Sequence, residues 1–138
     1  MTISYQTQVT ATSGRDGRAV AADGRLDLKL AIPKELGGPG GEATNPEQLF
    51  AAGYAACFLS ALKFVASKAH RPLPADTTVT ATVGIGPVPT GFALEVDLSV
   101  NAPGVATPVV HDLIERAHVV CPYSNATRGN IPVRISVK

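Results

Sequence analysis

Two cysteines, Cys57 and Cys121, are the residues of this chain best suited to covalent chemistry. They lie far apart in the sequence, which therefore contains neither the C-x-x-C spacing of dithiol redox motifs nor the paired spacing of zinc sites. In a reducing compartment, such cysteines favour a catalytic or redox-sensing use over a purely structural disulfide. The alternative stays open, because unpaired cysteines are often buried as small apolar side chains.

The segment around Cys57, residues 47–64 (EQLFAAGYAACFLSALKF), predicts a helix that is apolar on nearly every side. Glu47 and Lys63 bracket an uncharged run that is shorter than the ~20 residues needed to span a bilayer, so we expect a core helix. An apolar helix middle raises the pKa of a thiol above ~8.5, whereas a nucleophilic cysteine has to be a thiolate. If Cys57 is a nucleophile, a cation has to come from elsewhere in the chain.

The motif GRDGR offers two such cations, Arg15 and Arg18, in a turn between two predicted strands. A guanidinium stays charged even when it is partly buried, although a solvated turn is the alternative interpretation. Glu47 lies about 15 Å before Cys57 along the helix axis, so its carboxylate cannot touch the sulfur. It could hold an arginine that does, or it could be a carboxylate favoured by the positive end of the helix dipole.

The hydrophobic pattern predicts an α+β fold of about six strands in antiparallel hairpins packed with two main helices. The strands are expected at residues 3–12, 18–23, 25–32, 77–84, 92–100 and 131–138, and the helices at residues 46 to about 70 and 108–120. Asn45 suits an N-cap and Pro46 the first helical position, which sets the start of the first helix. Pro122 is expected to end the second helix, which leaves Cys121 at its C-terminal end.

The composition is that of an ordinary globular protein, with 138 residues, 45% apolar and 17% charged. We therefore expect a single domain over residues 1–138. A net charge of +1 gives no broad field to attract nucleic acid or a membrane, and we expect neither partner. The first residues do not have the pattern of a secretory signal, so we expect a cytoplasmic protein. The histidines have no metal-ligand spacing and no dinucleotide motif occurs, which predicts no metal and no cofactor.

Three stretches of the chain together resemble the organic hydroperoxide resistance family, the Ohr branch of the Ohr/OsmC proteins. They are SGRDGRAV, LGGPGGEATNPEQLFAAGYAACFLSALKFVA and HVVCPYSNATRGNI. The resemblance implies an OsmC/Ohr-like fold and an intertwined homodimer with its sites at the subunit interface. A helix that is apolar around its whole circumference needs cover on all sides, which agrees with a dimer.

The resemblance also implies a role for each of four residues. Cys57 matches the cysteine that attacks the peroxide, and Cys121 matches the resolving cysteine. Arg15 matches the catalytic arginine, and Glu47 matches the glutamate that holds it. Such a protein reduces organic hydroperoxides to alcohols through a sulfenic acid at Cys57 and a Cys57–Cys121 disulfide, which a dithiol reopens. In the family this dithiol is typically a lipoyl group on a protein.

The aromatic residues Phe50, Tyr54 and Phe58 are expected to line an apolar substrate pocket that favours an organic hydroperoxide over hydrogen peroxide. The alternative function is a non-catalytic thiol redox sensor or an apolar-ligand binding protein. The absence of a basic patch counts against a sensor that binds DNA.

Overall fold

The computed structural model describes all residues, Met1 to Lys138, and divides into two compact units, Met1–Leu49 and Phe50–Lys138. Helix α1 (Pro46–Lys68) begins in the first unit and continues through the second. The predicted α+β class and the six strands are confirmed, as two three-stranded sheets with three α-helices. The organisation as a single domain over residues 1–138 stays a prediction.

The first unit contains an antiparallel sheet in the order β1-β2-β3. Its elements are β1 (Val9–Thr12), the 3₁₀ helix η1 (Gly14–Asp16), β2 (Arg18–Ala21), β3 (Asp27–Lys29) and the 3₁₀ helix η2 (Lys34–Leu36). The strands lie where they were predicted but are shorter. The first spans only four residues, because β2 ends opposite Val9 and the residues before Val9 have no partner strand.

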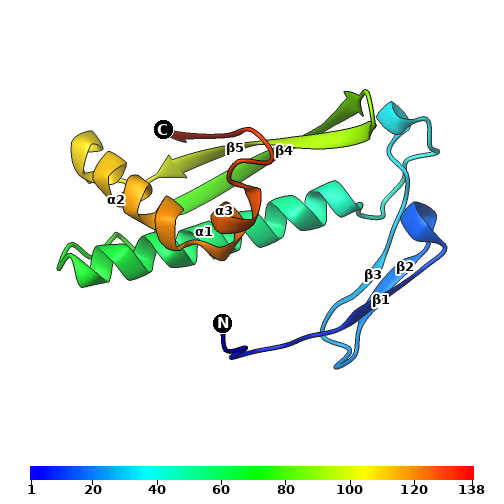
Figure 1. Ribbon diagram of the computed structural model, residues 1–138, viewed down its shortest axis with the longest axis horizontal. Helices are drawn as coiled ribbons and strands as arrows, with labels where there is room; N and C mark the ends of the chain where they lie inside the picture. The colour runs from blue at the N-terminus through cyan, green and yellow to red at the C-terminus, as the bar shows by residue number, and fades with distance from the viewer. The chain divides into compact units, whose positions relative to one another are not determined.

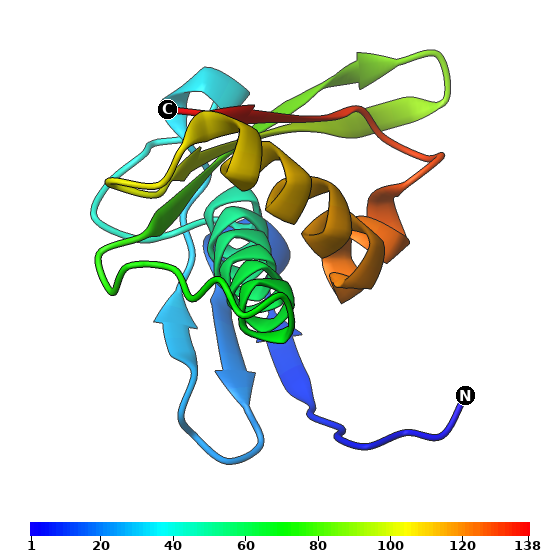
Figure 2. The same cartoon turned by 90° about the vertical axis from the view of Figure 1, so that its left-hand side faces the viewer.

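The second unit contains a mixed sheet in the order β4-β5-β6 together with the helices (Figures 1 and 2). Its elements besides α1 are β4 (Thr78–Val88), β5 (Gly91–Asn101), α2 (Thr107–Val120), α3 (Pro122–Thr127) and β6 (Val133–Val137). The last strand differs from the predicted antiparallel pairing, because β6 lies parallel to β5. The reason is topological: α2 and α3 form a crossover that returns the chain to the same end of the sheet.

The β4–β5 hairpin is longer than the sequence predicted. The predicted turn over residues 86–91 contains strand residues, with Pro87 opposite Phe92, and only Pro89 and Thr90 connect the two strands. A proline is tolerated there because β4 is an edge strand, whose outward N–H groups need no partner in the sheet.

Helix α1 begins at Pro46, as predicted. The side-chain Oδ1 of Asn45 accepts a hydrogen bond from the backbone N–H of Gln48 at 2.9 Å, which is the geometry of an N-cap. The helix ends at Lys68, where His70 takes a left-handed backbone conformation with φ of 53°. The N–H of Arg71 then bonds back to the carbonyl of Ala66 at 2.9 Å, which closes the last turn.

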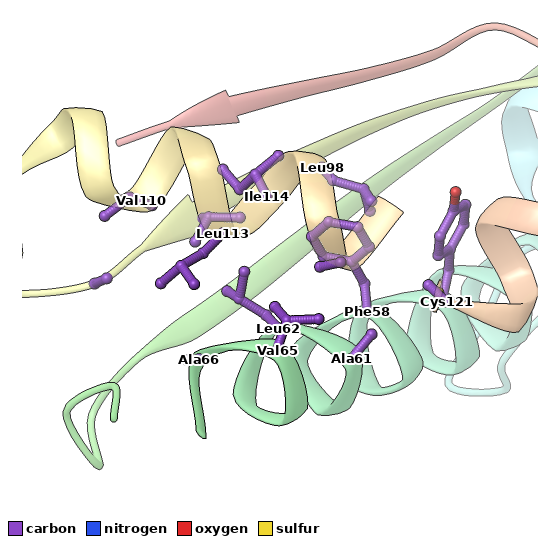
Figure 3. Packing of buried hydrophobic residues seen from close by; sticks show 14 of the residues in the cluster. Phe58, Ala61, Leu62, Val65, Ala66, Leu98, Val110, Leu113, Ile114 and Cys121 are labelled. Atoms are coloured by element: carbon purple, nitrogen blue, oxygen red, sulfur yellow. The ribbon is translucent and has the colours of Figure 1, made fainter. Parts of the chain in front are cut away.

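The core of the second unit is formed by inward-facing side chains of α1, β5 and α2 (Figure 3). Fully buried members include Tyr54, Phe58, Leu62, Val96, Leu98, Val100, Val110 and Leu113. Each such apolar side chain contributes about 1.5–3 kcal/mol of transfer free energy. By length and composition alone α1 could also cross a bilayer, a property that core helices of soluble proteins share. Its buried face belongs to this core, which agrees with the predicted core helix.

Replacing the cap residue tests how α1 begins. Asn45→Ala removes the acceptor for the Gln48 N–H, so we expect the free energy of unfolding to fall by about 1 kcal/mol. Urea denaturation followed by circular dichroism measures this change. Asn45→Asp keeps an acceptor and is the control, which should stay close to the wild type. Equal stability of the Ala and Asp variants would contradict the cap.

Candidate active site

The structure brings the two cysteines into contact although 64 residues separate them, with their Sγ atoms 3.8 Å apart. Cys57 comes from the middle of α1 and is partly buried, whereas Cys121 is fully buried. Both are free thiols. At this distance neither backbone has far to move before an S–S bond of about 2.05 Å can form.

Cys121 occupies the junction between α2 and α3. Its N–H bonds to the carbonyl of Ala117 and its own carbonyl accepts from Asn125, each at 2.9 Å, so it is both the C-cap of α2 and the N-cap of α3. The position at the end of α2 was predicted, but α3 was not. Pro122 was taken only as a stop, whereas it also suits the first position of a new helix.

The environment of Cys57 disfavours its thiolate. Burial raises the pKa of the Cys57 thiol above its ordinary value, and the neighbouring Cys121 raises it further. A hydrogen bond from the backbone N–H of Tyr123 lowers this pKa but does not reverse the shift. Because the pKa of Cys57 is raised, a nucleophilic role for this thiol would need a nearby cation, as the sequence also indicated.

Arg15 and Glu47 form the bidentate ion pair that the resemblance implies. The Arg15 Nη1 and Nη2 atoms donate to the two carboxylate oxygens of Glu47 at 2.8 and 2.6 Å. These hydrogen bonds hold the pKa of Glu47 below its usual range and raise that of Arg15. The other candidate cation, Arg18, is paired instead with Asp27 at the surface, at 2.6 and 2.9 Å. The roles of Arg15 and Glu47 in catalysis stay predictions.

The turn that presents Arg15 has strict backbone requirements. Ser13 and Gly14 both have positive φ, 56° and 63°. At Gly17 an added Cβ would lie 1.8 Å from the carbonyl oxygen of Thr12, so only glycine fits. The motif SGRDG is thus a fixed frame around Arg15, which the sequence analysis identified only as a turn.

Of the three aromatic residues expected to line a substrate pocket, only Phe50 borders an open groove, and its role toward a substrate stays a prediction. It lines an apolar groove of about 470 Å³ together with Phe92, Ala93, Leu94, Tyr123, Ala126, Thr127, Asn130 and Ile131. Tyr54 and Phe58 are fully buried in the core and do not line it, because they lie on the inward face of α1. Neither cysteine lines the groove, but Tyr123, two residues after Cys121, does.

The groove residue Tyr123 was missed by the sequence analysis, although a nearby glycine is a signal for it. A Cβ on Gly53 of α1 would lie 2.6 Å from the Tyr123 hydroxyl oxygen, so the absence of a side chain at Gly53 lets this ring lie against the helix. The structure contains no cluster of three or more His, Cys, Asp or Glu side chains that could hold a metal ion.

Comparison with known proteins places this arrangement in a family. The model of the OsmC-like protein family matches residues 38–136. The chain belongs to this family, in its organic hydroperoxide resistance branch. It is 52% identical over 135 residues to the organic hydroperoxide resistance protein of Xanthomonas axonopodis pv. citri, covering 98% of this chain and 95% of that protein. It is 43% identical over 140 residues to OhrA of Bacillus subtilis, covering 96% and 95%.

Solved structures agree with the assignment. The crystal structure of an organic hydroperoxide resistance protein from Legionella pneumophila superposes with a TM-score of 0.94 at 48% identity, covering 99% of each chain. The names of these relatives support a role of this family member in resistance to organic hydroperoxides and in the response to oxidative stress.

Gly17→Ala tests the frame around Arg15. Because the new Cβ would overlap the Thr12 carbonyl, the turn has to open, and we expect the free energy of unfolding to fall by about 1–3 kcal/mol. The control is Gly86→Ala, at a glycine that likewise has no positive φ but has no atom within 4 Å of an added Cβ. Denaturant unfolding should give a larger loss for Gly17→Ala. A loss no greater than that of the control would contradict the close approach.

Proposed function

We propose that the protein is a cysteine-based peroxidase that reduces organic hydroperoxides to alcohols. The observation that supports this most is the 3.8 Å separation of the two Sγ atoms. Both cysteines lie within residues 38–136, which match the family model. The Cys57 thiolate attacks the terminal oxygen of the hydroperoxide, an S–O bond forms and the O–O bond breaks. The alkoxide takes a proton and leaves as the alcohol, and Cys57 becomes a sulfenic acid.

Cys121 resolves this intermediate. Its sulfur attacks the Cys57 sulfur, the hydroxyl group leaves as water, and a disulfide forms, which prevents further oxidation to the irreversible sulfinic acid. Two thiol–disulfide exchanges with an external dithiol then restore both thiols. We propose a protein-bound lipoyl group as this reductant and a homodimer, as the resemblance implies. We also propose a cytoplasmic location.

We propose that Arg15 supplies the positive charge that the Cys57 thiolate requires and stabilises the negative charge that develops as the O–O bond breaks. Glu47 would fix the guanidinium through the two hydrogen bonds at 2.8 and 2.6 Å. The raised pKa of Cys57 in its own surroundings is the reason that such a cation is needed.

The groove lined by Phe50 and Tyr123 suits the apolar part of the substrate. Each CH₂ group that leaves water there contributes about 0.8 kcal/mol, so an organic hydroperoxide with a tail of several carbons should be preferred over hydrogen peroxide.

Cysteine substitutions test the two thiol roles. Cys57→Ser should abolish consumption of cumene hydroperoxide in the presence of a dithiol. Cys121→Ser should keep the first oxidation but accumulate sulfenic or sulfinic acid at Cys57, which intact-mass spectrometry detects. Turnover that survives Cys57→Ser would contradict the proposal. Stoichiometric oxidation without a catalytic cycle under any dithiol would favour a redox sensor or an apolar-ligand binding protein instead.

Arg15→Lys tests the cation. Lysine cannot make the bidentate contact with Glu47, so we expect kcat/KM to fall by about 100-fold and the pKa of Cys57, measured by iodoacetamide alkylation, to rise. Arg18→Lys is the matched control, because Arg18 pairs with Asp27 at the surface. Near-wild-type rates for Arg15→Lys would refute the assigned role.

A further inference from the structure

We propose that the hydroxyl group of Tyr54 positions the resolving cysteine, so that Tyr54 is a positioning residue for disulfide formation. This inference rests on the proposed function, because it concerns the step in which Cys121 attacks the oxidised Cys57. It was not anticipated from the sequence, where Tyr54 was expected to line the substrate pocket.

Tyr54 lies on α1 one helical turn before Cys57 and is fully buried. Its hydroxyl oxygen lies 3.0 Å from Ser124 Oγ and 3.1 Å from Thr127 Oγ1, both on α3. Thr127 Oγ1 in turn donates to the carbonyl of Ser124 at 3.2 Å. Ser124 and Thr127 are also buried, at 0% and 5% exposure. The three hydroxyl groups therefore satisfy one another inside an otherwise apolar core, which links α3 to α1.

The position of α3 determines where Cys121 meets Cys57, with the two Sγ atoms 3.8 Å apart. Cys121 is the N-cap of α3, and its carbonyl accepts the hydrogen bond from Asn125 in the first turn of that helix. A helix of six residues has little stability of its own, so it needs a tertiary anchor. The Tyr54 hydroxyl is that anchor, one turn from the sulfur.

The aromatic ring and the hydroxyl of Tyr54 have separable roles. The ring packs against Tyr123 and Phe50, with centroids 5.6 and 6.1 Å away. A phenylalanine would keep these contacts and remove only the bonds to Ser124 and Thr127. Tyr54→Phe therefore isolates the contribution of the hydroxyl to the placement of α3.

The sulfenic acid at Cys57 has two competing fates. It condenses with the Cys121 thiol and releases water, or it reacts with a second hydroperoxide to give a sulfinic acid and an alcohol. The first reaction is intramolecular, whereas the second is proportional to the hydroperoxide concentration. Loosening α3 slows only the condensation with Cys121. The hydroperoxide concentration at which half of Cys57 is overoxidised in one turnover therefore reports how well Cys121 is placed for that condensation.

In Tyr54→Phe we expect this concentration to fall by about fivefold, the effect of losing one net hydrogen bond, while the rate of the first oxidation stays within about twofold of the wild type. Quenched reactions over a series of cumene hydroperoxide concentrations, analysed by mass spectrometry, give both values. Leu62→Val is the matched control, because it removes a buried methylene of the same helix outside the hydroxyl cluster. It should lower the stability without changing the partition.

Ser124→Ala is a second variant that should repeat the effect of Tyr54→Phe. The effect of the Tyr54→Phe/Ser124→Ala double variant on the partition should be smaller than the sum of the two single effects.

A second measurement does not require peroxidase activity. In glutathione redox buffers, the effective concentration of Cys57 and Cys121 for each other should also fall by about fivefold in Tyr54→Phe. If the effective concentration falls in Tyr54→Phe but neither the wild type nor any variant turns over hydroperoxide, the proposed function fails and the positioning role of Tyr54 stands. If both the partition and the effective concentration are unchanged in Tyr54→Phe and in Ser124→Ala, the inference is overturned.

Discussion

The contact between the sulfur atoms of Cys57 and Cys121, 3.8 Å apart, depends on how three helices meet. Cys57 sits in the middle of α1, on the margin of its buried face, and Cys121 sits where α2 ends and α3 begins. The core that α1 shares with β5 and α2 fixes the first helix pair, and the buried hydroxyl cluster of Tyr54, Ser124 and Thr127 fixes the short third helix. The chemistry of the thiols follows from this packing.

The same burial that brings the thiols together opposes their reactivity, because it raises the pKa of Cys57. A nucleophile in this position requires compensation: the backbone of Tyr123 lowers this pKa only in part, and we propose Arg15 as the cation that completes it. Glu47 uses both carboxylate oxygens to orient the Arg15 guanidinium. A carboxylate at the start of α1 thus does more than complement the helix dipole, the simpler interpretation that the sequence allowed.

Features that depend on local chemistry could be predicted from the sequence. Asn45 followed by Pro46 gave the start of α1, and the alternation in residues 92–100 matches the buried Val96, Leu98 and Val100 of β5. The pairing of the cysteines and of Arg15 with Glu47 came from the family resemblance, since neither is encoded in local spacing. What failed depends on long-range packing: the parallel partner of β6, the short helix after Cys121, and the inward direction of Tyr54 and Phe58.

The product of a single oxidation tests the proposed roles of the two cysteines most directly. The reduced protein is treated with one equivalent of cumene hydroperoxide, quenched with acid, and mapped by mass spectrometry of peptides kept under non-reducing conditions. We expect a disulfide that joins the peptides of Cys57 and Cys121 within one chain, with one equivalent of alcohol released. A sulfinic acid at Cys57 beside a free Cys121 thiol, or no oxidation of either cysteine, would contradict these roles.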